Sequence, residues 1–72
     1  MKIWDILKEE NVNKYYKIID NHTFRNYLDG CIVKVNKSVS GFIGLFNETG
    51  TAVQILTTNL LYLDFEEVEK DD

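Results

Sequence analysis

The sequence has one cysteine, one histidine and no proline among its 72 residues. A disulfide needs two cysteines, so none can form within the chain, and no Cys/His cluster offers a structural zinc site. No apolar run approaches the roughly 20 residues of a membrane-spanning helix. The opening MKIWD carries an acid and leads into no long apolar stretch, so it does not resemble a signal peptide. These absences favour a reducing cytoplasm.

The length predicts a single domain over residues 1–72, with residues 69–72 as a frayed acidic tail. A domain of this size buries only about 60% of the surface that its unfolded chain exposes. Its core is expected to supply about 3–5 kcal/mol of net stability. A deep catalytic cleft is therefore not expected.

No residue pattern predicts catalysis or a metal site. His22 stands close to Asp20 in the sequence, but no nucleophile is placed beside the pair, and an exposed turn histidine is expected. Cys31 opens an alternating segment and is expected to be a small buried hydrophobe. The terminal acids lack the spaced ligands and central glycine of a calcium loop. We therefore predict a non-enzymatic protein without metal or cofactor.

The hydrophobic pattern predicts an α+β fold. An N-terminal amphipathic helix over residues 2–10, with Ile3, Ile6 and Leu7 on one face, would pack on a small, mainly antiparallel sheet. Four to five strands are expected, and the last is an edge strand with Phe65 and Val68 pointing inward. The strand segments are 14–20, 31–37, 39–47, 51–56 and 64–69, with turns at 21–23 and 29–30, a short helical turn at 60–63, and an ambiguous segment at 24–29.

The segment 39–47 is apolar on both faces, and Phe42 and Phe46 share one of them. This pattern indicates either a central strand or a strand whose outer face meets a partner. The following tight connection places Gly50 where a positive φ is needed.

The net charge of −4 is unevenly distributed along the chain. Residues 64–72 hold six acids and one lysine, a net charge of −5, while residues 1–63 sum to +1. Within that body, residues 14–37 carry five basic and two acidic side chains, a net charge of +3. The sequence therefore predicts a mildly basic middle and an acidic C-terminal end.

Both ends of the chain resemble a known group of proteins. The opening MKIWDILKEENV and the closing LLYLDFEEV are similar to a loose group of small phage and prophage proteins of Firmicutes, especially clostridia. Members of that group begin with an amphipathic helix and end with an F-E-E-V strand. The resemblance covers about the first 17 and last 10 residues, and Asn13 stands where glycine is expected. It implies a phage protein acting in the host cytoplasm.

Small acidic phage proteins often act against bacterial immunity, as anti-CRISPR inhibitors do. The leading hypothesis is therefore a binding protein that inhibits a host defence component through a protein–protein contact. The candidate contact residues are the acidic end, Glu66, Glu67, Glu69, Asp71 and Asp72, or the aromatics Phe42 and Phe46.

Two other functions are kept open. A homo-oligomer could sequester a nucleotide second messenger, with phosphate contacts from Lys14, Lys17, Arg25 and Lys34. A phage structural or replication accessory protein is the weaker alternative. Cations and aromatics interleave in the basic middle as in single-strand binders, but a pI of about 4.8 argues against nucleic acid as the partner.

Overall fold

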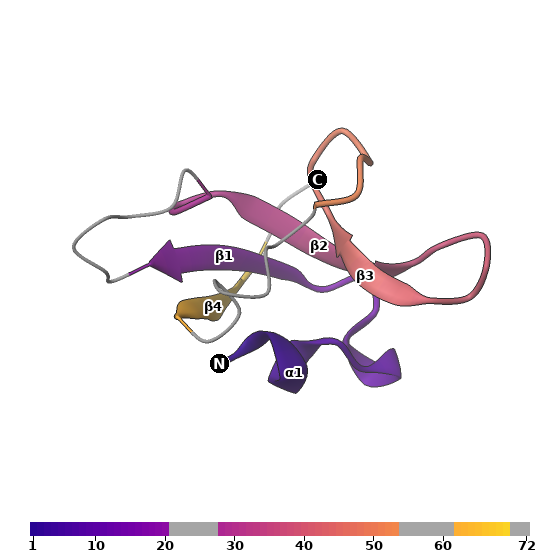
Figure 1. Cartoon of the computed structure of the whole chain (residues 1–72), viewed down its shortest axis with the longest axis horizontal. Helices are drawn as coiled ribbons and strands as arrows, with labels where there is room; N and C mark the ends of the chain where they lie inside the picture. Colours follow the sequence, from indigo (N-terminus) through magenta and orange to yellow (C-terminus); the bar gives the residue numbers. More distant parts are fainter. Residues whose placement is uncertain (21–27, 54–61, 70–72) are drawn as a thin grey trace.

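The computed structural model describes residues 1–20, 28–53 and 62–69, which form an antiparallel sheet with a short helical segment on one face (Figure 1). The elements are α1 (Ile3–Ile6), a 3₁₀ turn η1 (Glu9–Asn11), β1 (Tyr15–Asp20), β2 (Ile32–Lys37), β3 (Ile43–Phe46) and β4 (Leu63–Val68). The strand order is β3-β2-β1-β4. The predicted α+β class is confirmed, with four strands in the described part of the chain. No helix in these residues is long and apolar enough to cross a membrane.

The expected helix over residues 2–10 is wrong in extent, because α1 ends after four residues. The side chain of Asn11 explains the break. Its Nδ2 donates to the carbonyl of Ile6 (3.1 Å), an acceptor that a continuing helix would use for its own backbone. The chain then makes one 3₁₀ turn instead. This short segment still buries Ile6 completely, whereas Trp4 is 55% exposed.

β1 lies between β2 and β4, and its pairing with β4 runs the full length of both strands, from Tyr15↔Val68 to Asp20↔Leu63. The expected edge strand at 64–69 is thus confirmed, shifted by one residue. Met1 strengthens the outer edge of β4. Its amino group donates to the Phe65 carbonyl (3.0 Å), and the Phe65 N–H donates to the Met1 carbonyl (2.7 Å).

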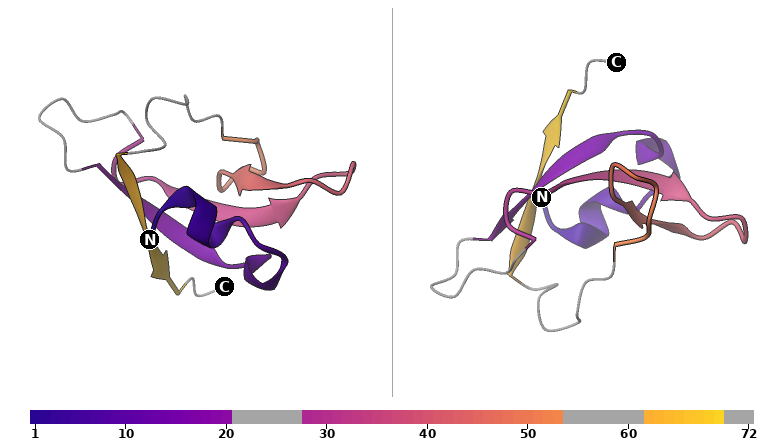
Figure 2. Two further views of the ribbon diagram at one scale, coloured as in Figure 1. Left: turned by 60° about the horizontal axis from the view of Figure 1, so that its bottom comes forward. Right: turned by 90° about the horizontal axis from the view of Figure 1, so that it is seen from above.

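The prediction of a strand over residues 39–47 is wrong for residues 39–42, because the chain turns there and β3 begins only at Ile43. Gly41 has a φ of +87°, in the left-handed region that favours glycine. The Ser38 N–H donates to the Phe42 carbonyl (2.8 Å), and the Ser38 hydroxyl accepts from the Phe42 N–H (3.2 Å). This connection projects away from the sheet (Figures 1 and 2).

After β3 the chain turns back at residues 47–50, where Gly50 has a φ of +88°, as expected. A return strand is expected over residues 51–56. Residues 51–53 are described, and they contain one isolated bridge, between Phe46 and Ala52. Residues 54–56 lie outside the described part of the chain, as do residues 21–23, 24–27 and 60–61. The helical turn expected at 60–63 is wrong at its last residue, because Leu63 is the first residue of β4.

One face of the sheet carries the core, and α1 lies on this face (Figure 2). Strand alternation points Tyr16 and Ile18 of β1 into the core, together with Phe65 of β4, which confirms the expectation for Phe65. The same expectation for Val68 is wrong, because it lies three positions after Phe65 in the strand and alternation turns it to the other face, where it is half-buried. The complete set of buried hydrophobic residues among those described is Ile6, Tyr16, Ile18, Leu28, Val33, Val35, Leu45, Leu63 and Phe65.

The expectation that Cys31 is buried is wrong. Its side chain is exposed, because β2 begins one residue later, at Ile32. The predicted turn before the strand is confirmed, and Gly30 adopts a positive φ of +85° within it. The alternation expected for the strand itself is also confirmed, since Val33 and Val35 are buried.

The short α1 segment gives a test of which side chain anchors the N-terminus. We expect Ile6→Ala to lower the free energy of unfolding by about 2–5 kcal/mol, because it empties a fully buried position. Trp4→Ala should cost about 1 kcal/mol or less, since Trp4 is largely exposed. Urea denaturation of both variants measures this difference. Equal losses would contradict the burial pattern described here.

Candidate functional site

The acidic end predicted as a contact surface lies along the outer strand β4. Glu66 and Glu67 are exposed, and because they are consecutive in a strand, their side chains point to opposite faces of the sheet. Glu69 follows the strand and is exposed. Asp71 and Asp72 lie outside the described residues. The described carboxylates therefore line an edge and do not form one flat acidic patch.

The structure places the acidic end beside part of the basic middle. Lys14 Nζ lies 3.9 Å from Glu67 Oε1, and Lys17 is directly opposite Glu66 in the β1–β4 register. Exposed pairs of this kind contribute little to stability, about 0–1 kcal/mol. They do neutralise charges that the sequence separates by some fifty positions. The negative electrostatic potential at the β4 edge is therefore weaker than the acidic run in the sequence indicates.

The four basic residues predicted to bind phosphate do not form one cluster among the described residues. Lys14 and Lys17 lie beside the carboxylates of β4, whereas Lys34 lies on β2, between β1 and β3. Arg25 falls outside the described part of the chain. Lys34 is thus the one member of this set that lines a hollow in the surface that the structure describes.

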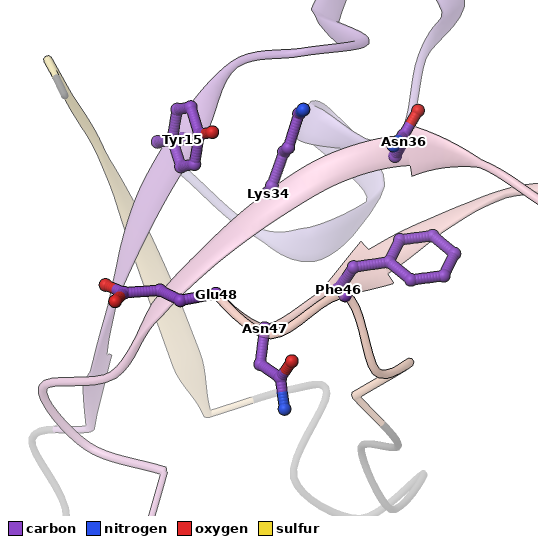
Figure 3. A pocket seen from close by; sticks show the side chains of 7 residues that line it. Tyr15, Lys34, Asn36, Phe46, Asn47 and Glu48 are labelled. Carbon is purple, nitrogen blue, oxygen red and sulfur yellow. The ribbon is translucent and has the colours of Figure 1, made fainter. Parts of the chain in front are cut away.

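This hollow lies on the face of the sheet opposite the core, which we call the second face. Tyr15, Lys34 and Phe46 are direct cross-strand neighbours there, one each from β1, β2 and β3. The hollow has a volume of about 250 Å³. Its lining residues are Tyr15, Lys34, Asn36, Phe46, Asn47, Glu48 and Gly50 (Figure 3).

The lysine of the hollow lies between two aromatic rings. Its ammonium nitrogen is 5.7 Å from the centroid of the Tyr15 ring, within the range of a cation–π contact. Figure 3 shows Tyr15 and Phe46 on opposite sides of Lys34, with Asn36 further along the same strand. Phe46 is half-buried, so its ring is already held in the sheet surface.

A well-ordered turn carries the remaining wall of the hollow. Asn47 Oδ1 accepts hydrogen bonds from the N–H groups of Thr49 (3.0 Å) and Thr51 (2.9 Å) and from the Thr49 hydroxyl (2.7 Å). The Asn47 carboxamide therefore builds the turn, and the turn positions Glu48 at the rim of the hollow.

A second surface feature is the turn between β2 and β3. Val39 is fully exposed and Phe42 is 76% exposed, and we call these two residues the hairpin tip. The backbone and hydroxyl of Ser38 bond across this turn to the backbone of Phe42, as described above. At its base Lys37 forms an ion pair with Glu9.

The sequence interpretation placed Phe42 and Phe46 on one strand face, but the structure separates them. Phe42 belongs to the hairpin tip, and Phe46 lines the hollow. The sequence missed the exposure of Val39. The signal that could have found it is the run Ser38–Gly41, in which a serine precedes a glycine by three positions, as at a tight turn.

Other candidates for chemistry gain no support from the described residues. These residues contain no group of three or more His, Cys, Asp or Glu side chains that could hold a metal ion. Cys31 is exposed beside the turn that precedes β2. His22 lies outside the described residues, so its expected position in a turn stays a prediction.

The chain matches no protein-family model, and neither a curated protein nor a solved structure is recognisably similar to it.

One titratable side chain in the core is coupled to the acidic edge. Burial raises the pKa of Tyr16 above its ordinary value of 10.0, and the carboxylates of Glu67 and Glu10 raise it further. A tyrosine whose pKa is raised by folding stabilises the protein while its hydroxyl is protonated. That stabilisation is complete below pH 10 and is lost as the pH rises through the folded-state pKa.

We therefore expect stability to fall above pH 10, and Tyr16→Phe to reduce this fall because phenylalanine does not ionise. Thermal melting from pH 8 to pH 11.5 measures the effect as the difference between variant and wild type. Tyr15→Phe is the matched control, since it removes an adjacent phenol on the second face. Equal alkaline slopes for Tyr16→Phe and the wild type would contradict the assignment.

Proposed function

We propose that this protein is a non-enzymatic, phage-encoded binding protein that inhibits a host defence component through a protein–protein contact. The observation that carries the proposal is the hairpin tip, where two large apolar side chains project into solvent on an ordered turn. The resemblance of the chain ends to small phage proteins motivates the host target and a site of action in the host cytoplasm.

The physical basis is the cost of leaving these side chains in water. Fully burying an exposed valine or phenylalanine is worth about 1.5–3 kcal/mol, and neighbouring exposed apolar side chains that form a patch often mark contact sites. The hydrogen bonds of Ser38 fix the turn before any partner arrives. A pre-ordered contact loses less conformational freedom on binding, so more of the burial energy appears as affinity.

The exposed carboxylates of β4 have a secondary role in this proposal. Glu66, Glu67 and Glu69 would favour a partner with a basic surface. Lys14 and Lys17 lie beside two of these carboxylates and partly neutralise them. We therefore assign the carboxylates to steering and to the salt dependence of association. The hairpin tip supplies the larger share of the binding energy.

The test compares two exposed aromatic residues in different places. Tagged wild-type protein, Phe42→Ala and Trp4→Ala are used to capture partners from a host-cell lysate, and affinities for the captured protein are then measured. We expect Phe42→Ala to weaken binding by at least about tenfold, and Trp4→Ala to leave it within about twofold. We also expect Phe42→Ala to lose inhibition of the host component and Trp4→Ala to retain it.

Replacing Glu66, Glu67 and the adjoining Glu69 by glutamine should slow association and flatten its salt dependence, with a smaller effect on dissociation. Unchanged binding by Phe42→Ala together with full loss in the glutamine variant would move the contact from the hairpin tip to the β4 edge. Unchanged binding in both variants would overturn the proposed surface.

A further inference from the structure

From the hollow on the second face we infer a binding site for a single nucleotide, separate from the hairpin tip. The hollow combines an aromatic surface, one ammonium group and an amide donor within adjoining strands. These three groups match three features of a nucleotide: the flat face of its base, the hydrogen-bonding edge of that base, and its anionic phosphate.

The aromatic part of the site is Phe46, with Tyr15 on the far side of the lysine (Figure 3). Phe46 is half-buried, so one part of its ring packs in the sheet and the remainder faces outward. Nucleic-acid bases stack on aromatic side chains displayed in this way on a sheet surface. The cross-strand neighbour of Phe46 is Lys34 on β2. The phosphate of a nucleotide whose base stacks on Phe46 is therefore within reach of the ammonium group.

The charge of the hollow sets the number of phosphates. Lys34 is the one cation among the residues that line it, and Glu48 adds a carboxylate at the rim. One ammonium group offsets one negative charge of a phosphate, whereas each further phosphate adds negative charge beside the Glu48 carboxylate. A nucleoside monophosphate therefore fits the hollow better than a triphosphate.

The amide of Asn36 is oriented by the backbone of the next residue, Lys37. Its Oδ1 accepts a hydrogen bond from the Lys37 N–H (2.8 Å), which leaves Nδ2 as the donor for a ligand. A nucleobase presents ring nitrogen and carbonyl acceptors along its edge, and asparagine is a usual partner for them.

The size of the hollow limits the ligand further. Its volume of about 250 Å³ lies below the range of about 300–1,000 Å³ typical of sites for drug-sized molecules. The hollow can therefore take one base and its phosphate and cannot enclose a dinucleotide. The same nucleotide could be free in solution or form the end of a strand, and the test separates these sources.

The test is a titration of the folded, isotope-labelled chain, followed by two-dimensional NMR of its amides. The probes are AMP, GMP, CMP and UMP, with ATP, the four nucleosides, inorganic phosphate and a tetrauridylate as comparison arms. We expect saturable shifts with at least one monophosphate, centred on the amides of Lys34, Asn36, Phe46 and Glu48. The corresponding nucleoside should bind at least about tenfold more weakly, and ATP no more tightly.

Three variants locate the site. Lys34→Gln keeps most of the side-chain stem and should weaken binding of the monophosphate by about tenfold, to the level of the nucleoside. Phe46→Leu keeps apolar bulk and should weaken both ligands. Lys17→Gln is the matched control, because Lys17 is an exposed lysine of the neighbouring strand and does not line the hollow.

Binding of the tetrauridylate with the same dependence on Lys34 and Phe46 supports the site and assigns the nucleotide to a strand end. The inference is overturned if no monophosphate gives a saturable shift at about 1 mM, or if inorganic phosphate binds as tightly as the nucleotides. It is also overturned if Lys17→Gln weakens binding as much as Lys34→Gln. If a variant fails to fold, the inference is judged on the wild-type chain, by whether the amides that shift are those of the hollow. Loss of this site leaves the hairpin-tip contact untouched, since the two lie on different parts of the chain.

Discussion

The pairing of β1 with β4 is the constraint on which the described structure depends. It joins residues 15–20 to residues 63–68 along the full length of both strands, and it makes β1 the inner strand between β2 and β4. Buried partners such as Ile18 and Phe65 lie opposite each other in this pairing. Met1 is then hydrogen-bonded to the outer edge of β4, which places α1 against the core face.

The same pairing redistributes the charge of the chain. Along the sequence, an acidic end of −5 is far from a basic middle of +3. In the sheet, Glu66 and Glu67 lie beside Lys17 and Lys14. Asp64 in turn forms an ion pair with Lys2 (3.1 Å). Electrostatics at this edge therefore favours orientation and rate of encounter over affinity, and apolar contact has to supply most of the binding energy of the proposed complex.

The parts of the fold that could be predicted are those that depend on local alternation. The segments 14–20, 31–37 and 64–69 show a period of two or are rich in β-branched and aromatic residues, and each forms a strand. The N-terminal helix is shorter than predicted because a local side-chain hydrogen bond decides its length. The Asn11 side chain captures the Ile6 carbonyl, and a helical spacing of apolar residues does not reveal such competition.

The candidate surfaces were harder to predict for a related reason. The exposure of Phe42 follows from Gly41 and Ser38, which turn the chain where alternation indicates a strand. The hollow depends on register. Tyr15, Lys34 and Phe46 are neighbours because of how three strands align, and a slip of one residue would move each side chain of the slipped strand to the other face.

The register of β1 and β4 is therefore the most direct test of the account. The backbone groups of Ile18 bond with Cys31 and Gly30, and those of Phe65 bond with Met1. Ile18 and Phe65 thus form a non-hydrogen-bonded pair, whose Cα atoms are expected to lie about 4.5 Å apart. A proton NOESY spectrum should show a strong Hα–Hα cross-peak between these two residues, and another between Tyr16 and Glu67. Absence of these peaks, with Ile18 instead opposite Asp64 or Glu66, would contradict the account.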